Sequence, residues 1–251
     1  MHVSTLARSL LLWPRAVLHP RIIMSAPLAM GAPIEVERKF EPPASIEELD
    51  RKVIANGGEK RGAKSFKDVY WDTLGCSLTR RDTWLRCRSQ GNRQQWELKV
   101  PVGDANRSGG ERTVFREVEG TEQVDEALRS LLSSELASAP PHTAPQETLE
   151  EMLARIGVQP FAEFETTRTQ WQLGTCSLDA DVASFGHAVM EIEVMCTSAD
   201  DVARAEADIQ ETAALVGARP LGKLGGKLET YIRRHCPDVL TQLVDAGVLR
   251  A

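Results

Sequence analysis

Cysteine pairs and long hydrophobic runs are both missing from this chain of 251 residues. Five cysteines occur, and they form no C-x-x-C pair. An odd number of scattered cysteines in a chain of this length indicates reduced intracellular thiols and argues against a structural zinc site. The apolar run Leu10–Trp13 ends at Pro14 and is too short to span a bilayer, so we expect no membrane partner.

Positive charge is not in excess, and acidic residues are missing from the start of the chain. Lys and Arg total 30 against 36 Asp and Glu, a net charge of −6, so we expect no nucleic-acid partner. No acidic residue precedes Glu35, although three arginines are spread through this stretch. We therefore predict that residues 1–33 form an N-terminal extension that is either disordered or similar to an organelle transit segment. Translation that restarts at Met24 or Met30 is the alternative.

Several catalytic signatures are also missing. The chain contains no H-E-x-x-H and no G-x-S-x-G sequence. The stretch 222–227 is similar to a phosphate-binding P-loop, but Leu221 occupies the position of its first glycine. Leu228 replaces the Ser or Thr that would contact Mg²⁺, so this stretch is not a P-loop.

A series of strand-like segments makes up most of the chain after residue 34. Residues 34–40 alternate with a period of two, and a capping box of Ser45 and Glu48 then opens a helix that ends near Ala55. Further strands are expected at 65–72, 82–90, 93–100, 112–119, 161–173, 175–183 and 187–196. Further helices are expected at 121–136, before 156, at 198–215, and from 227 and 238. About eight strands with helices between them predict an α+β fold.

Like charges repeat at alternate positions of these strands, which places each pair on one face of its strand. The pairs are Glu35 and Glu37, Arg86 and Arg88, Glu117 and Glu119, Asp179 and Asp181, and Glu191 and Glu193. A solvated sheet face explains each pair taken singly. If all of these faces line a closed barrel, however, the lumen has an acidic and a basic wall and needs charged ligands. A polyphosphate with a divalent metal ion would satisfy both walls.

The sequence Glu35-Val36-Glu37-Arg38-Lys39 matches the ExExK signature of the CYTH superfamily, the triphosphate tunnel metalloenzymes. Other family segments follow in order: Tyr70–Thr73, Trp84–Arg88, Trp96–Lys99, Arg116-Glu117, Arg168, Leu178-Asp179, Glu191–Glu193 and Gly226–Leu228. The chain resembles this superfamily over residues 34–235, and the animal thiamine triphosphatases most of all. The resemblance implies an eight-stranded antiparallel closed β-barrel with helices packed outside. Residues 236–251 would form a separate C-terminal helix.

The resemblance also implies roles for individual residues. A wall of carboxylates would bind Mg²⁺, with Mn²⁺ as a possible substitute: Glu35, Glu37, Asp179, Glu191 and Glu193. Basic residues would hold the triphosphate: Lys39, Arg86, Arg88, Lys99, Arg168 and Lys227. Tyr70 would act with Lys99 in positioning or protonating groups at the phosphate, unless it is a packing aromatic. Trp84 would stack on the organic base of the substrate, unless it only packs at the barrel rim.

The activity implied is Mg²⁺-dependent hydrolysis of thiamine triphosphate to thiamine diphosphate and phosphate. Hydrolysis of tripolyphosphate or nucleoside triphosphates, a cyclase of the same fold, and a non-catalytic polyphosphate-binding module are the alternatives. We expect a monomer whose partner is the small-molecule triphosphate. We expect it to be soluble and intracellular: cytoplasmic by resemblance, or mitochondrial if residues 1–33 direct import.

Overall fold

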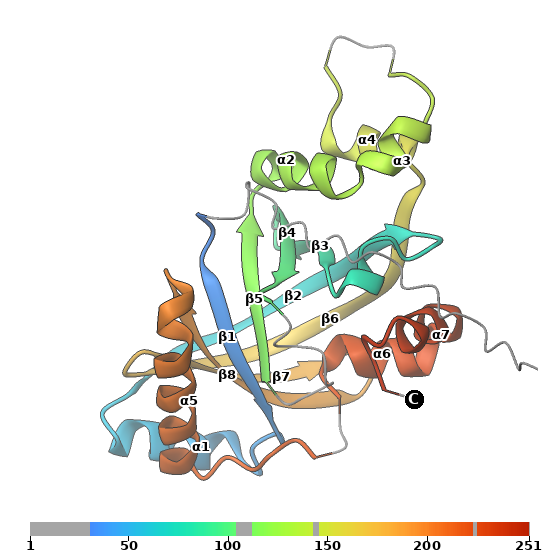
Figure 1. Ribbon diagram of the computed structural model, residues 1–251. Coiled ribbons are helices and arrows are strands. Elements are labelled where there is room, and N and C mark those ends of the chain that lie inside the picture. Colours follow the sequence, from blue (N-terminus) through green and yellow to red (C-terminus); the bar gives the residue numbers. More distant parts are fainter. Residues whose placement is uncertain (1–30, 104–111, 143–145, 223–224, 251) are drawn as a thin grey trace, which may run out of the picture.

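Eight antiparallel strands form a closed barrel in the computed structural model, which describes residues 31–103, 112–142, 146–222 and 225–250 (Figure 1). The order around the barrel is β1-β5-β4-β3-β2-β6-β7-β8. The strands are β1 (Ile34–Phe40), β2 (Glu59–Thr73), β3 (Trp84–Gln90), β4 (Arg93–Pro101), β5 (Arg112–Glu119), β6 (Val158–Leu173), β7 (Cys176–Ala183) and β8 (His187–Cys196). This confirms the predicted α+β barrel. Residues 1–30 of the predicted extension and residues 104–111 of the loop 101–111 lie outside the described residues.

Strand β2 begins six residues earlier than the alternation of apolar residues predicts. Residues 59–64 are polar and largely exposed, so no apolar pattern marks them as a strand. They are nevertheless paired with β6, where Glu59 lies opposite Gln172. The pairing register of β2 with β6 shifts between Lys60 and Gly62. Gly62 has φ of +115°, a backbone conformation that favours glycine. Pairing with a long neighbouring strand thus extends β2 beyond its apolar part.

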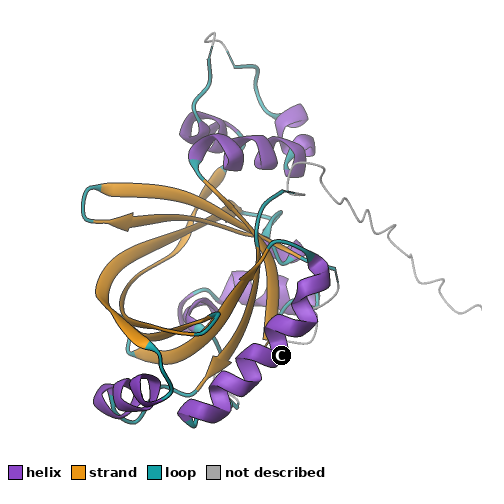
Figure 2. Cartoon of the chain, turned by 90° about the vertical axis from the view of Figure 1, so that its left-hand side faces the viewer, coloured by secondary structure: helices purple, strands orange, loops and turns teal. Residues whose placement is uncertain are grey.

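The helices lie outside the barrel wall (Figure 2). They are α1 (Ile46–Ala55), α2 (Thr121–Leu131), α3 (Ser133–Ser138), α4 (Leu149–Arg155), α5 (Val202–Val216), α6 (Lys227–His235) and α7 (Pro237–Asp245). The prediction of one continuous helix over 121–136 is wrong. The structure has two helices there, α2 and α3, and the chain bends between them at Leu132. Leu132 is fully buried beside Leu128, so the bend keeps this side chain in the core. Within the described ranges, every helix is too short or too polar to cross a bilayer.

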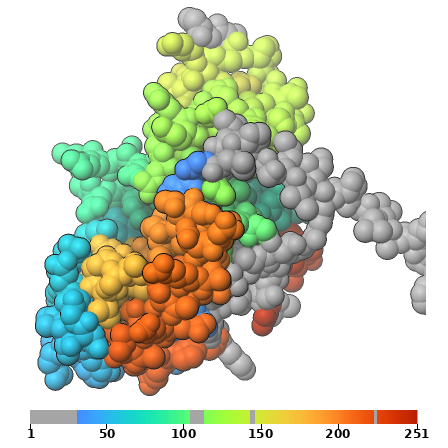
Figure 3. Space-filling model, turned by 60° about the vertical axis from the view of Figure 1, so that its left-hand side comes forward, coloured from blue at the N-terminus to red at the C-terminus, as the bar shows by residue number. Residues whose placement is uncertain are grey.

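Two apolar layers join these helices to the outer face of the barrel. Helix α5 packs over β1, β7 and β8, and α1 packs beside it over β2 and β6; Ile209 of α5 and Val53 of α1 are fully buried there (Figure 3, α5 in orange). Helix α2 packs over β4 and β5, and α4 packs beside it over β6, around Leu98, Leu128 and Leu153. Because apolar residues occupy the outward positions of these strands, the alternating polar residues point into the barrel.

An aromatic cluster and α6 lie at one end of the barrel (Figure 1). Tyr70 and Phe164 project from neighbouring strands with ring centroids 5.8 Å apart. Tyr231 of α6 packs against Phe164 at 5.4 Å and against Phe185 at 5.3 Å. The C-terminal residues predicted as a separate helix thus follow α6 directly, and they reach the cavity described next.

Candidate active site

A cavity of about 230 Å³ occupies the barrel lumen and extends to the C-terminal residues. Alternate residues of the strands line it: Glu35, Glu37, Lys39, Tyr70, Trp84, Arg86, Arg88, Lys99, Thr113, Phe115, Arg168, Glu191 and Glu193. Residues between and after the strands complete it: Asp82, Leu221, Gly222, Gly225, Gly226, Lys227, Leu228, Glu229, Val248 and Leu249. Twelve of the thirteen predicted site residues therefore line one cavity. Asp179 alone is missing from the lining and is fully buried behind it.

Three carboxylates from β1 and β8 form what we call the glutamate cluster: Glu35, Glu37 and Glu193. One oxygen of each lies within 4.8 Å of the others, a spacing at which a single cation can contact all three. Glu37 lies directly opposite Glu193 in the register of β1 and β8. Burial and the carboxylates of Glu35 and Asp179 raise the pKa of Glu193 well above its ordinary value. Lys99 contacts Glu35 and Lys39 contacts Glu37, whereas Glu193 has no ion pair among the described residues, so the uncompensated carboxylate of this cluster is Glu193.

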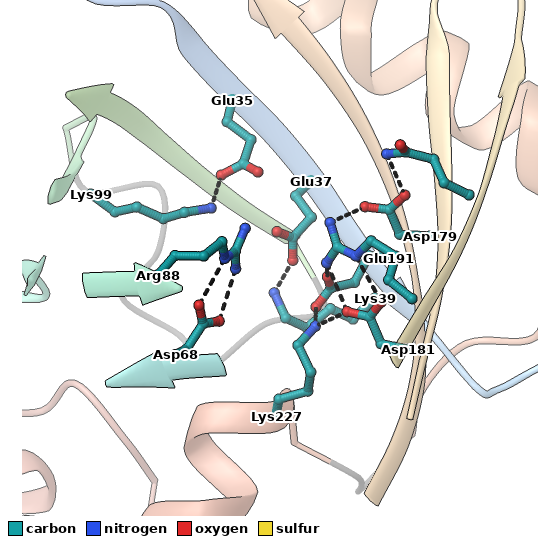
Figure 4. A network of polar contacts seen from close by, with 12 residues as sticks. Glu35, Glu37, Lys39, Asp68, Arg88, Lys99, Asp179, Asp181, Glu191 and Lys227 are labelled. Atoms are coloured by element: carbon teal, nitrogen blue, oxygen red, sulfur yellow. Dashed lines mark hydrogen bonds and ion pairs between the residues drawn. The ribbon is translucent and has the colours of Figure 1, made fainter. Parts of the chain in front are cut away.

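A second group, the ion-pair cluster, consists of Asp179, Asp181 and Glu191 with Arg168 and Lys227 (Figure 4). The Arg168 guanidinium donates to both oxygens of Asp181 at 2.7 Å and to Glu191 at 3.1 Å. Lys227 contacts Asp181 and lies 2.8 Å from Glu191. Burial alone would raise the pKa of Glu191, but Lys227 and Lys39 outweigh it and hold that pKa well below its ordinary value.

Asp179 is the member of the ion-pair cluster that does not line the cavity. Its carboxylate contacts Arg168 and accepts a hydrogen bond of 2.8 Å from Gln170. In the register of β7 and β8 it lies directly opposite Glu191. Burial raises the pKa of Asp179 to about 6, although Arg168 opposes this shift. Of the five predicted metal ligands, the structure gathers three within reach of one ion and places Asp179 and Glu191 in ion pairs.

The basic residues of β3 are held by carboxylates that the sequence analysis did not select. Arg88 donates to both oxygens of Asp68 at 2.7 and 2.8 Å, and its guanidinium lies 4.0 Å above the ring of Phe66. Arg86 donates to Glu97 at 2.6 Å. Burial alone would raise the pKa of Asp68, but the two arginines outweigh it and lower that pKa. These pairs fix the guanidinium groups in place before any ligand binds.

Two lysines contact the glutamate cluster: Lys99 of β4 and Lys39 of β1. Lys99 contacts Glu35 and lies 3.2 Å from Glu117, and Lys39 contacts Glu37 (Figure 4). Burial alone would lower the pKa of Lys99, but Glu35 and Glu117 outweigh it and raise that pKa well above its ordinary value. Lys99 therefore stays protonated and acts as a cation. The strands β7, β8 and β1, which carry the five predicted metal ligands, are neighbours in the barrel, and so are β4 and β3, which carry Lys99, Arg86 and Arg88. Lys39 and Lys227 nevertheless contact carboxylates on the acidic side of the lumen.

Tyr70 and Trp84 lie on the side of the cavity nearest α6 and the C-terminus. Tyr70 lies opposite Arg86 in the register of β2 and β3, and it packs against Phe161 and Phe164. Trp84 lies opposite Lys99, and its indole N–H donates to Asp82 at 2.9 Å. Both residues line the cavity, which agrees with their predicted places.

The sequence analysis missed Asp68, Asp82, Phe115 and the apolar residues Val248 and Leu249. Asp68 has no like-charged neighbour two positions away, so it lacked the repeat that marked the other carboxylates. Its position between Phe66 and Tyr70 on the inward face of β2 is a signal that could have revealed it. Val248 and Leu249 reach the cavity through the turn after α7, where the Val248 N–H donates to the Leu243 carbonyl at 2.9 Å.

A closed barrel whose lumen gathers carboxylates and cations defines a class of protein that binds anionic phosphates together with metal ions. Residues 33–222 match the CYTH domain family. The thiamine-triphosphatase of Homo sapiens is 29% identical over 226 residues, which cover 86% of this chain and 92% of that protein. The thiamine-triphosphatase of Macaca fascicularis is 30% identical over 223 residues, which cover 85% and 90%.

A solved structure supports the fold independently. A protein of Vibrio parahaemolyticus that is described as a candidate adenylate cyclase superposes with a TM-score of 0.53 at 15% identity, covering 80% of this chain and 98% of that one. This likeness shows the barrel fold alone. The match over residues 33–222 shows that the chain belongs to the CYTH family, and with the two thiamine-triphosphatase relatives it identifies the chain as a triphosphate-hydrolysing enzyme.

Proposed function

We propose that this chain hydrolyses thiamine triphosphate to thiamine diphosphate and phosphate with Mg²⁺. The observation that carries the proposal is one cavity in which the glutamate cluster lies beside the six predicted phosphate-binding cations, with an indole at one side. Two relatives named thiamine-triphosphatase cover nearly the same length of chain. Mn²⁺ is the expected substitute, because it also prefers carboxylate oxygens.

The glutamate cluster fits a hard divalent cation. Its three carboxylates offer oxygen ligands within 4.8 Å of one another, and the raised pKa of Glu193 reflects negative charge that a cation would compensate. Asp179 and Glu191 remain predicted ligands, and they would need to leave part of their ion pairs to contribute. A bound divalent cation would supply charge neutralisation at the phosphate oxygens.

The side chains of the protein can position the triphosphate themselves. Arg86, Arg88 and Arg168 present fork-shaped donors that match phosphate oxygens, and they are held by carboxylates in the absence of substrate. Hydrolysis of the terminal phosphoryl group depends mainly on such positioning and on charge neutralisation. A carboxylate of the lumen would orient the attacking water. Protonated Lys99, with Tyr70 across the cavity, would stabilise charge that develops on the phosphate.

The organic base of the substrate would lie against Trp84. Trp84 and the cationic side chains occupy successive inward positions of β3, about 7 Å apart for each two residues. A flat thiazolium or pyrimidine beyond the α-phosphate would therefore reach the indole. A stack of this kind contributes about 1–2 kcal/mol when it is partly desolvated.

Comparison of three substrates in the presence of Mg²⁺ tests the proposal. We expect kcat/KM for thiamine triphosphate to exceed the values for tripolyphosphate and ATP. Trp84→Ala should lower kcat/KM for thiamine triphosphate about five- to thirtyfold and leave tripolyphosphate hydrolysis nearly unchanged. Arg86→Ala is the matched variant, and it should depress both substrates together. Equal losses on both substrates in Trp84→Ala would favour the tripolyphosphatase alternative.

We also propose that the chain works as a monomer in the cytoplasm, with the small-molecule triphosphate as its partner. The support is the resemblance of this chain to the thiamine-triphosphatase relatives, over most of its length. Sedimentation of the purified chain tests the first part. Imaging of a fluorescent fusion to the full chain tests the second, and mitochondrial signal would assign an import role to residues 1–33.

A further inference from the structure

We propose that Phe66 is a positioning residue of the triphosphate site, whose ring sets the spacing of two arginines that come from opposite sides of β2. This inference deepens the proposed function and rests on it. Phe66 is 3% exposed and is not among the described residues that line the cavity, so it does not contact the substrate. Arg88 and Arg168, in contrast, both line the cavity. Phe66 therefore acts through them.

The two arginines converge on this ring from distant backbone positions. In the register of β2 with β3, Arg88 lies opposite Asp68. In the register of β2 with β6, on the other side of β2, Arg168 lies opposite Lys64. These two levels are about 13 Å apart along the strand, with Phe66 midway between them. The guanidinium carbons nevertheless lie over the same ring, 4.0 Å from its centroid for Arg88 and 5.4 Å for Arg168.

The two arginines are paired with different carboxylates. Arg88 donates to the two oxygens of Asp68 at 2.7 and 2.8 Å. Arg168 donates to both oxygens of Asp181 at 2.7 Å. Each of these carboxylates fixes one arginine relative to its own part of the barrel wall. Phe66 contacts both guanidinium groups, so it couples the position of one arginine to that of the other.

Contact with the ring remains possible when the arginines bind a substrate. The attraction between a guanidinium and an aromatic face depends on the positive charge, and it needs no N–H directed at an acceptor atom. A phosphate group that replaces Asp68 or Asp181 as the acceptor therefore does not have to displace Phe66. The ring can hold both cations while carboxylates accept their N–H groups and while a triphosphate does.

A triphosphate is the kind of ligand that such a pair of arginines suits. It carries charged oxygens on three successive phosphorus atoms, and the planar fork of one guanidinium matches the oxygens of one phosphoryl group. Two forks that meet from opposite sides of β2 can therefore hold different phosphoryl groups of one chain. Because a small displacement of the reacting group lowers the rate strongly, the distance between the forks matters for turnover. Phe66 fixes that distance from beneath the cavity.

The substitution Phe66→Leu tests this role, since leucine keeps a buried apolar side chain and removes the aromatic face. The measurement is steady-state hydrolysis by the full chain, with Mg²⁺, of whichever of thiamine triphosphate, tripolyphosphate and ATP it hydrolyses fastest. We expect kcat to fall about tenfold, the size of effect of a desolvated contact between a cation and an aromatic ring. KM should change by less than about twofold, because the cations that attract the triphosphate remain.

A double-mutant cycle with Arg88→Lys separates positioning from a merely structural role. Lysine keeps the charge beside Asp68 but lacks the planar fork. If Phe66 acts through Arg88, Phe66→Leu should lower kcat by no more than about threefold in the Arg88→Lys background, the remainder being its effect through Arg168. A general effect on the fold would lower kcat by the same factor in both backgrounds.

Phe185→Leu is the matched control. Phe185 also has an arginine over its ring, Arg234 at 5.7 Å, but neither residue is among those that line the cavity. The variant undergoes the same change of side chain and loses the same kind of contact at a place outside the site. Its kcat should equal that of the wild type.

Two results would overturn the proposal. Unchanged kcat in Phe66→Leu would show that the ring does not position the arginines, and equal losses in the two backgrounds would show that Phe66 only supports the fold. Failure of the proposed function gives a different result. That function fails if thiamine triphosphate is not the preferred substrate, whereas the cycle is measured on whichever triphosphate is hydrolysed fastest.

Discussion

The glutamate cluster and the ion-pair cluster each bring three carboxylates into one barrel, yet they differ in how that charge is balanced. In the ion-pair cluster, Arg168 and Lys227 compensate the acids, and the pKa of Glu191 is lowered. In the glutamate cluster, the pKa of Glu193 is raised because burial and neighbouring carboxylates dominate. The two clusters are built from adjacent strands, and two cations contact each of them. Arg168 contacts all three carboxylates of the ion-pair cluster, whereas Lys99 and Lys39 contact only Glu35 and Glu37 and leave Glu193 without an ion pair among the described residues.

This difference assigns the clusters separate tasks. Carboxylates that already have cationic partners hold those cations rigidly and keep them in position for phosphate oxygens. Carboxylates that lack sufficient compensation gain most from a divalent cation. We therefore expect removal of the Glu193 charge to affect catalysis without loss of stability, and removal of the charge of Glu191, which is also a predicted ligand, to lower stability as well.

The largest expected effect is on turnover, in Glu193→Gln. This change keeps the shape of the side chain and removes one of three clustered oxygen ligands. Hydrolysis supported by Mg²⁺ should fall roughly a hundredfold to a thousandfold. The melting temperature should stay the same or rise, because repulsion between like charges is relieved. Phosphate release at a series of Mg²⁺ concentrations and thermal unfolding measure the two quantities. Near wild-type turnover would remove Glu193 from the proposed metal site.

The fold of this chain was more predictable than its site. The alternation in residues 34–40 and in 187–196 located β1 and β8 to the residue, because apolar residues on one side pack against helices. The same alternation placed Glu35 and Glu193 on the inward face. It could not show that Arg168 lies opposite Asp181, because the register between β6 and β7 is a tertiary property. Partners across strands therefore had to come from the structure.

Residues outside regular strands were the hardest to predict. Asp82 lies in a turn whose geometry depends on the buried Asp72, and no periodicity marks either residue. Leu249 reaches the cavity only because the turn after α7 folds back on Leu243. Composition and spacing do not indicate which residues outside the strands come close to the cavity. A matched family motif can do so: Lys227 was selected from such a motif, and it lies 2.8 Å from Glu191.

The next expected effect, on stability, is in Glu191→Gln. The substitution leaves Lys227 and Arg168 with Asp181 but removes a charge that both cations contact. A buried cation that loses one of its partners is destabilising, and we expect the free energy of unfolding to fall by about 3–5 kcal/mol. Urea unfolding of this variant and of Glu193→Gln gives the comparison directly. Equal stability of the two variants would contradict the division between the clusters.

The smallest expected effect extends the comparison to the arginines of β3 and depends on pH. Asp68 is fully buried and accepts two hydrogen bonds from Arg88, and the arginines lower its pKa. A carboxyl whose pKa is lower in the folded chain than its unfolded value of about 3.9 stabilises the fold fully above that value. The contribution is then lost as the pH falls through the lower, folded pKa. Asp68→Asn should therefore cost about 1–2 kcal/mol at pH 7, since hydrogen bonds to a charged group are of this size.

Urea unfolding of the wild type and of Asp68→Asn from pH 7 down to pH 2 measures this contribution. The stabilities of the two chains should begin to converge below about pH 4, and they should meet once the pH falls below the folded pKa, where the wild-type carboxyl is protonated and resembles the neutral amide. Glu163→Gln, on the outer surface, should show no such convergence, since exposed ion pairs contribute little. A constant difference across the whole range would mean that Asp68 stabilises the chain through packing against Phe164, its neighbour in the register of β6, and that Arg88 is positioned by other contacts.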